Sequence, residues 1–286
     1  MTSGSKLSAA RPDAEWSGGI RVALVQLASP DSESREARIA RVSALLRANP
    51  GADLYVLPEL WSAGYFAFAR YAELAESFDG PTVTMAQELA RELGAAIHLG
   101  SFIERDPSGT LHNTAVLVDA AGRIAQRYRK IHVFGYRSLE AELLTPGAEL
   151  SVVPGPLGAT ASTTCYDLRF PGLWQELSDR GAEAAIVPAA WPAARREHWR
   201  LLTQARAVEH QIWVVAVNAC GTQGEVELGG SSRIIDPSGR IVAECGAEEE
   251  VRIVTVDPDR VAEVRAEFPV LADRLERAAY RALGDV

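Results

Sequence analysis

The chain has 286 residues, 47% of them hydrophobic, which is enough to bury a large core without disulfides or a structural metal. Its formal net charge of −9 and its pI near 5.2 argue against a nucleic-acid-binding protein, which normally carries a basic patch. Three cysteines are too few for a disulfide framework, and no apolar run is long enough to predict a transmembrane helix.

The first residues of the chain, 1–19, are small and polar and lack the apolar middle region of a signal peptide. We expect a flexible tail there, followed by one folded domain over 20–286. Because cysteines are few and no targeting segment is visible, the sequence favours a reducing, cytoplasmic location.

Strand-like apolar runs alternate with helical patterns through the first half of the chain. A helix at 80–94 is favoured by the proline at its start and the glycine at its end, which suit the first turn and the closing backbone of a helix. An Asp-Ala-Ala-Gly turn at 119–122 joins two apolar runs in a predicted hairpin. The apolar periodicity predicts strands at 21–27, 53–57, 96–104, 113–118 and 123–129, and a helix at 34–48.

The second half continues the alternation, with a second hairpin around the Asp-Pro-Ser-Gly turn at 236–239. The C-terminal segment 259–283 is predicted to be helical and broken at Pro269. Further strands are predicted at 159–164, 184–188 and 212–218, and helices from Pro171 and over 199–210. Since hairpins interrupt the β–α alternation, the sheets should be mixed. The whole pattern predicts an α/β fold, a single-domain α-β-β-α sandwich of four layers with two mixed sheets.

Three predicted strands each lead into a residue that can do chemistry: Glu59, Lys130 and Cys165. Strand ends are where α/β enzymes gather catalytic groups on a rigid edge. Lys130 stands out because only two of the 29 basic residues are lysines, the other being Lys6 in the tail. Unlike arginine, lysine is a compact charge that can exchange a proton when buried.

A carboxylate, an amine and a thiol together form a complete hydrolytic set. The thiol attacks the carbon, the carboxylate accepts its proton, and the ammonium stabilises the negative charge that develops. Taken singly, each residue has a structural explanation as a buried small side chain or a solvated charge. Those structural explanations are the ones we adopt for Cys220, Cys245 and His98, which lie in or beside apolar strands.

The three residues stand in short motifs that occur in a fixed order along the chain. These are LPE at 57–59, YRKIH at 128–132 and CYDLRFP at 165–171, followed by the stretches 188–191 and 205–209. This ordered set resembles the nitrilase superfamily of carbon–nitrogen hydrolases, whose members use a Glu-Lys-Cys triad. The resemblance covers residues 20 to 270, and it implies Glu59 as the base, Lys130 as the cation and Cys165 as the nucleophile.

The resemblance also implies a second glutamate in the loop after the lysine, shortly before a Pro-Gly pair. Glu140 fits that spacing better than Glu142. Its expected role is to position Lys130 or the substrate through a charge-assisted hydrogen bond. Arg206 and Glu209, three residues apart on a predicted helix, are expected to form a structural ion pair.

The CYDLRFP form is most similar to the amidase branch that contains ω-amidases and deaminated-glutathione amidases, which act on amides of small acids. Arg169 and His132 are then expected to bind the substrate carboxylate, and Trp191 to line the acyl pocket. For Arg169 a structural ion pair with Asp167 or with a loop carboxylate is the alternative. The loop between His132 and the Pro-Gly pair is shorter than in many ω-amidase-like members, which leaves the exact amide open.

The predicted reaction is amide hydrolysis through a Cys165 thioester with release of ammonia. The Lys130 ammonium and the backbone N–H of Tyr166 would form the oxyanion hole. No metal or organic cofactor is expected, and the partners are a small amide and further copies of the chain in a homodimer or larger oligomer. Three alternatives stay open: an amide-forming acyltransferase, a Cys–His hydrolase using His132 or His198, and a non-catalytic binding protein.

Overall fold

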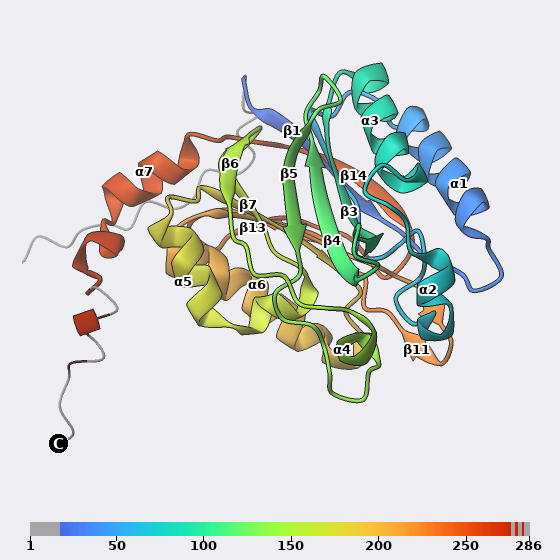
Figure 1. Ribbon diagram of the computed structural model, residues 1–286. Coiled ribbons are helices and arrows are strands. Elements are labelled where there is room, and N and C mark those ends of the chain that lie inside the picture. Colours follow the sequence, from blue (N-terminus) through green and yellow to red (C-terminus); the bar gives the residue numbers. More distant parts are fainter. Residues whose placement is uncertain (1–17, 276–277, 280–281, 283–286) are drawn as a thin grey trace, which may run out of the picture.

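The computed structural model describes residues 18–275, 278–279 and 282. In this part of the chain, two six-stranded sheets lie face to face between two pairs of helices (Figure 1). The first sheet has the order β14-β1-β2-β3-β4-β5. Its strands β1, β2 and β3 are parallel, and the others are antiparallel to their neighbours. The strands are β1 Ile20–Gln26, β2 Leu54–Val56, β3 Ala96–Arg105, β4 Leu111–Val118, β5 Ile124–Arg129 and β14 Glu250–Val256.

The second sheet repeats the plan of the first. Its order is β13-β12-β9-β8-β7-β6, with β7, β8 and β9 parallel and antiparallel strands on both sides. The mixed character predicted for both sheets is therefore confirmed. The strands are β6 Val152–Gly155, β7 Gly158–Ser162, β8 Ala184–Ala189, β9 Trp213–Asn218, β12 Arg233–Ile235 and β13 Ile241–Glu244.

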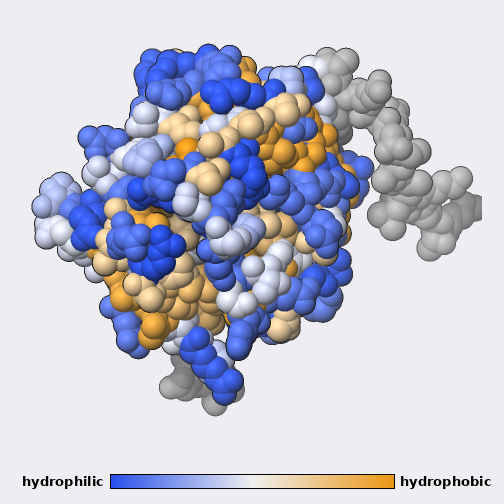
Figure 2. Space-filling model, turned by 90° about the vertical axis from the view of Figure 1, so that its right-hand side faces the viewer, coloured by the Kyte–Doolittle hydropathy of each residue, from blue (hydrophilic) through white to orange (hydrophobic). Residues whose placement is uncertain are grey.

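Two helices cover the outer face of each sheet. Helices α1 (Arg35–Ala48) and α3 (Pro81–Leu93) pack on the first sheet, and α5 (Pro171–Asp179) and α6 (Arg196–His210) pack on the second. The side that carries α1 and α3 is mostly hydrophilic, with hydrophobic areas between the polar residues (Figure 2). The predicted four-layer α-β-β-α sandwich is thus confirmed. The shorter elements are α2 Tyr71–Leu74, α4 Glu140–Leu143, α7 Arg260–Glu267, η1 Phe68–Arg70, η2 Cys165–Arg169, η3 Ala193–Arg195, η4 Val270–Asp273, β10 Thr222–Gln223 and β11 Val226–Glu227.

The alternation of side chains along the strands explains the layers. On β1, Ala23 and Val25 face the helices, whereas Val22 and Leu24 point into the space between the sheets. There they join branched side chains of β2, β8 and β9, all of them excluded from solvent. Burying both faces of a central strand accounts for its nearly continuous apolar sequence.

Differences from the predicted elements lie mainly at sheet edges. The strands β6 and β14 were not predicted, and α6 begins at Arg196 instead of residue 199. Helix α7 ends before Pro269, where a break was predicted. Most residues after 275 in the predicted helical segment lie outside the described residues. The predicted tail up to residue 17 also lies outside them. None of the described helices combines the length and the hydrophobicity that crossing a membrane requires.

Candidate active site

Glu59 lies in the loop that follows β2, and the neighbouring strand β3 is shaped to hold this loop. Gly100 interrupts the β3 register with φ +73°, and a Cβ at this position would overlap the carbonyl oxygen of Pro58. The next residue, Ser101, accepts a hydrogen bond on Oγ from the N–H of Leu60 at 3.1 Å. A glycine at this point therefore allows the loop to pack closely enough to bury the Glu59 side chain.

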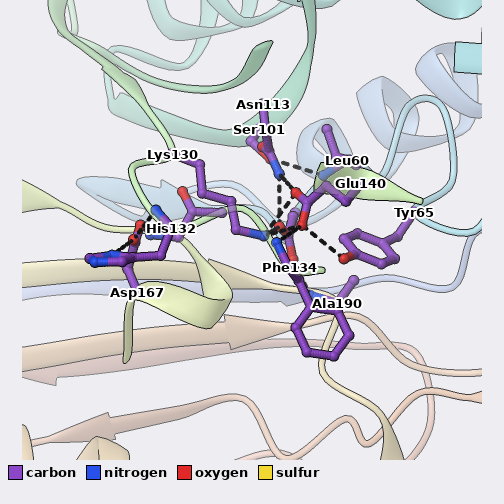
Figure 3. Close-up of polar contacts among 12 residues, drawn as sticks. Leu60, Tyr65, Ser101, Asn113, Lys130, His132, Phe134, Glu140, Asp167 and Ala190 are labelled. Carbon is purple, nitrogen blue, oxygen red and sulfur yellow. Dashed lines mark hydrogen bonds and ion pairs between the residues drawn. The ribbon is translucent and has the colours of Figure 1, made fainter. Parts of the chain in front are cut away.

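Lys130 follows β5 directly, and its ammonium group lies between two buried carboxylates (Figure 3). Its Nζ donates to Glu59 Oε1 at 2.8 Å and to both carboxylate oxygens of Glu140 at 2.9 Å. The side chains of all three residues have 0% exposure. Buried charges persist when they are paired and hydrogen-bonded in this way.

Glu140, and not Glu142, is the second acid of this cluster. It begins α4 and also accepts hydrogen bonds from the hydroxyl of Tyr65 at 3.0 Å and the backbone N–H of Phe134 at 2.7 Å. Glu142 is exposed to solvent. The spacing from the Pro-Gly pair thus selected the residue that contacts Lys130.

Two further groups bind the acids and were missed by the sequence analysis. The side-chain amide of Asn113 donates to Glu59 Oε1 at 2.8 Å and to Glu140 Oε1 at 2.9 Å. The backbone N–H of Ala190, just after β8, donates to Glu59 Oε2 at 2.9 Å. The hairpin offered a signal for Asn113, because counting back from its turn places this residue opposite Lys130, whose N–H donates to the Asn113 carbonyl oxygen at 2.8 Å.

Cys165 brings its thiol to the same cluster from the second sheet. It begins the η2 turn after β7, and its buried thiol lies close enough to Glu59, Lys130 and Glu140 to be affected by their charges. Its φ of +47° lies in the left-handed region, which costs a residue other than glycine roughly 1–3 kcal/mol and recurs at functional sites. Three distant strand ends therefore bring a thiol, a carboxylate and an ammonium into one buried cluster.

Burial and charge set the protonation of this cluster. Burial, together with the charge of Glu140, raises the pKa of Glu59 above its ordinary value. Burial alone would lower the pKa of Lys130, but Glu140 and Glu59 reverse this, so that the pKa lies well above its usual range. Burial and the negative charge of Glu59 raise the pKa of the Cys165 thiol well above its ordinary value. The resting site thus holds a neutral thiol beside a potential base and a permanent cation.

A pocket of about 290 Å³ opens onto Cys165, and its wall combines aromatic rings with arginines. The guanidinium of Arg169 lies 4.5 Å over the ring of Trp191, and that of Arg195 lies 5.7 Å from the ring of Phe134. Arg169 also contacts His198 Nδ1 at 3.3 Å. Within the described residues, neither arginine has a carboxylate partner; the ion pair considered for Arg169 and Asp167 is not formed.

Comparison with known proteins gives a consistent result. A sequence model of the carbon-nitrogen hydrolase family matches residues 21–266. The chain belongs to the carbon-nitrogen hydrolase family. It is 40% identical over 264 residues to a 2-oxoglutaramate amidase of Paenarthrobacter nicotinovorans, covering 90% of each chain, and 32% identical over 270 residues to the omega-amidase NIT3 of Saccharomyces cerevisiae, covering 89% and 93%.

Solved structures support the same membership. A CN-hydrolase superfamily protein from Xanthomonas campestris, described with an arsenic adduct in its active site, superposes with a TM-score of 0.83 at 31% identity, covering 93% of this chain and 100% of the other. Saccharomyces cerevisiae Nit3, a nitrilase superfamily member, gives 0.78 at 30% identity, covering 88% and 94%. The predicted superfamily is confirmed, and this carbon-nitrogen hydrolase is an enzyme of the amidase kind.

His132 lies elsewhere than its expected role in this hydrolase would require. Its ring Nδ1 contacts Asp167 Oδ1 at 2.7 Å, and the ring stacks on Phe170 with centroids 3.7 Å apart. Figure 3 shows the imidazole and the Lys130 amine pointing to different sides of the backbone. His132 is not among the residues that line the pocket onto which Cys165 opens. Asp167 is therefore the group that this imidazole binds.

The residues expected to be structural have structural partners. Arg206 pairs with Glu209 at 2.7 Å and also donates to the carbonyl oxygen of Leu168. His98 is fully buried and contacts Ser162 Oγ at 3.0 Å; burial lowers its pKa to about 3. Burial likewise raises the pKa of two other thiols, Cys220 and Cys245, to about 12. His98 and the two thiols are therefore neutral at physiological pH, whereas Arg206 and Glu209 form an ion pair.

Proposed function

We propose that this carbon-nitrogen hydrolase cleaves the amide of a small acid that carries a free carboxylate, with Cys165 as the nucleophile and Glu59 as the base. One observation carries the proposal. The Cys165 thiol belongs to the same buried cluster as Glu59 and the Lys130 ammonium, and it lines a pocket whose wall holds arginines that have no carboxylate partner among the described residues.

In the first half of the reaction, Glu59 takes the thiol proton while sulfur attacks the amide carbonyl carbon. A C–S bond forms and the carbonyl π electrons move to oxygen, next to Lys130 and the backbone N–H of Tyr166. The C–N bond then breaks, and the leaving nitrogen takes the proton from Glu59. Ammonia departs and a Cys165 thioester remains.

In the second half, water replaces ammonia. Glu59 accepts a proton from the water as its oxygen attacks the thioester carbon. The C–S bond breaks, the acid product is released, and sulfur recovers its proton from Glu59. Atoms and protons balance without a cofactor.

Lys130 acts in this scheme as a fixed positive charge. Its pKa lies far above neutrality, so it does not supply the proton that ammonia needs. Its three N–H groups are engaged by Glu59 and Glu140 in this structure. Lys130 therefore stabilises the oxyanion either through its charge alone or by redirecting to the oxyanion one of the two hydrogen bonds that it donates to Glu140. In either case Glu140 holds the ammonium group in position.

Two arginines support a carboxylate-bearing substrate. Arg169 and Arg195 both line the pocket, and after burial their mutual repulsion contributes to lowering the pKa of Arg169. A carboxylate between them would supply the missing negative charge, and arginine binds carboxylates through two parallel hydrogen bonds. The names of the relatives, 2-oxoglutaramate amidase and omega-amidase, fit such a substrate.

The test is ammonia release from pairs of small amides that differ only in a distal carboxylate. We expect the acid amides to have the higher kcat/KM, and Arg169→Ala and Arg195→Ala to raise KM for them by roughly 10- to 100-fold while leaving neutral amides unaffected. Arg240→Ala, at a site away from the pocket, is the control. Equal turnover of acid and neutral amides would remove the substrate assignment, and normal turnover by Cys165→Ala would remove the mechanism.

The Cys–His alternative receives no support from the contacts of the thiol. The charged and hydrogen-bonding groups that act on Cys165 are Glu59, Lys130 and Glu140, whereas His132 binds Asp167 and His198 contacts Arg169. Glu59→Gln separates the two mechanisms, because a Cys–His enzyme would keep its activity.

We also propose that the protein is a cytoplasmic homodimer or larger homo-oligomer. Exposed apolar side chains on α6, Leu201 at 67% and Val208 at 51%, support self-association through this helix. Light scattering on the wild type and on Leu201→Glu measures it; a monomeric wild type would contradict the proposal.

A further inference from the structure

We infer that Asn113 is a positioning residue for catalysis, holding the carboxylates of Glu59 and Glu140 in place and keeping Glu59 ionised so that it can accept the thiol proton. The inference rests on the proposed role of Glu59 and adds a residue that does not touch the pocket. Asn113 is 1% exposed and lies on β4, next to the end of β5.

The amide of Asn113 is oriented by its partners. Its nitrogen lies 2.8 Å from Glu59 Oε1 and 2.9 Å from Glu140 Oε1. Because ionised carboxylates only accept hydrogen bonds, the flipped amide would place oxygen against oxygen. Within the described residues, the Asn113 oxygen has no hydrogen-bond partner. The buried amide therefore leaves its acceptor unused, at a cost, in order to place both N–H groups on the two acids.

The charges of the cluster explain why these donors matter. Glu59 faces Lys130 from the end of β5, Glu140 from α4 and Cys165 from η2; Tyr65 lies next to Glu140. Two carboxylates share one ammonium, so their repulsion is only partly cancelled. Asn113 adds two donors without adding charge.

Two consequences follow for Glu59. Its Oε1 is shared by Lys130 and Asn113, while Oε2 is bound by the backbone N–H of Ala190, so the carboxylate plane is fixed. Hydrogen bonds to an ionised carboxylate favour that form. Loss of the Asn113 donor should therefore raise the pKa of Glu59 and loosen its orientation toward Cys165.

The experiment compares the pH profiles of kcat/KM for the wild type, Asn113→Leu and Asn113→Asp. The leucine variant keeps the approximate shape but has no donor, and we expect its acidic limb to move up by about one pH unit. Its kcat should fall on the order of 100-fold with little change in KM, because Asn113 does not contact substrate. Asn113→Asp replaces the donor by a third carboxylate, so its acidic limb should move up further than that of the leucine variant.

Thr114→Val is the matched control. Thr114 is the next residue on β4, is equally buried, and donates to a carboxylate outside the cluster, Glu104 Oε2, at 2.6 Å. It should lose stability without moving the acidic limb. Thermal unfolding establishes that each variant is folded; since Asn113→Asp is isosteric, it tests the inference if the leucine variant does not fold.

An unchanged acidic limb in both Asn113 variants, or a fall in activity that the Thr114 control reproduces, would overturn the inference. Glu59→Gln separates this result from a failure of the proposed function. If Glu59→Gln stays active, the role of Glu59 is wrong; if it is inactive while the Asn113 variants keep the wild-type profile, only the role of Asn113 is wrong.

Discussion

Asp167 binds His132 twice, accepting its backbone N–H at 2.9 Å and its ring Nδ1 at 2.7 Å on the same oxygen. The other carboxylate oxygen accepts the hydroxyl of Tyr128 on β5 and the N–H of Thr164 beside the nucleophile. One buried carboxylate therefore ties the strand end that carries Lys130 to the turn that carries Cys165.

This tie predicts that His132 supports catalysis without binding substrate. In His132→Ala, Asp167 loses one donor, and we expect kcat to fall about tenfold with KM unchanged. His132→Asn, whose amide nitrogen can replace ring Nδ1, should recover most of the loss. Steady-state kinetics measure both values. A rise in KM confined to carboxylate-bearing amides would instead make His132 a substrate ligand.

Removing the cation at position 130 should destabilise the fold as well as end turnover. Lys130→Met leaves Glu59 buried without its counter-ion, which should cost about 3–5 kcal/mol at neutral pH. A buried carboxyl whose pKa is raised in the folded state contributes stability below its unfolded pKa and loses it as the pH rises through the folded pKa. The deficit should therefore grow as the pH rises above the ordinary 4.5 of a glutamate.

Urea unfolding of the wild type and of Lys130→Met across this range measures the deficit. Lys130→Arg is the comparison variant, since it keeps the charge and should be less destabilised but equally inactive. A pH-independent deficit in Lys130→Met would contradict the electrostatic account.

The activity profile should be set on its acidic side by Glu59. This residue must be ionised to accept the thiol proton, and its pKa is raised by burial. Activity should therefore fall as the pH drops through a value above the ordinary 4.5 of a glutamate. Because the pKa of Cys165 lies well above 9.0, ionisation of the thiol should produce no alkaline limb below about pH 9. A kcat/KM profile measured with an acid amide tests both limbs, and an alkaline limb near neutrality would indicate a thiolate–ammonium pair.

Thiol labelling should single out one cysteine of three. Cys165 lines the pocket and has a base, whereas burial raises the pKa of Cys220 and Cys245 to about 12. Iodoacetamide on the native protein should modify Cys165 alone, and labelling should drop sharply in Glu59→Gln. Mass spectrometry locates the adducts, with the urea-unfolded protein as the control in which all three react. Equal native labelling of Cys220 would show that the core opens readily.

The sequence predicted the central strands because burial on both faces leaves nearly continuous apolar runs, as in 21–27 and 184–188. It missed β14 at one sheet edge, where charged residues such as Arg252 interrupt the apolar pattern although the strand pairs with β1 along its whole length. A pairing between residues more than 200 positions apart has no local signal.

In the candidate site, too, residues with a local sequence signal could be predicted, and groups that depend on long-range pairing could not. Glu59, Lys130 and Cys165 follow strands that the sequence located, and their contact could be expected from that placement. Asn113 and the Ala190 N–H could not, because one requires the hairpin register and the other is a backbone group. His132 was assigned to the substrate since its motif lies beside Lys130, but the chain bends after β5 ends at Arg129, and the imidazole binds Asp167 instead.

The repeated strand order of the two sheets divides the catalytic machinery between halves of the chain. The acids and the ammonium come from residues up to 140, and the sulfur comes from the other side of the sandwich. Neither half alone could turn over substrate, even if correctly folded. The rate of the reaction therefore depends on how accurately the two halves pack together. A substitution in the apolar core between the two sheets can abolish activity although every reacting group is still present.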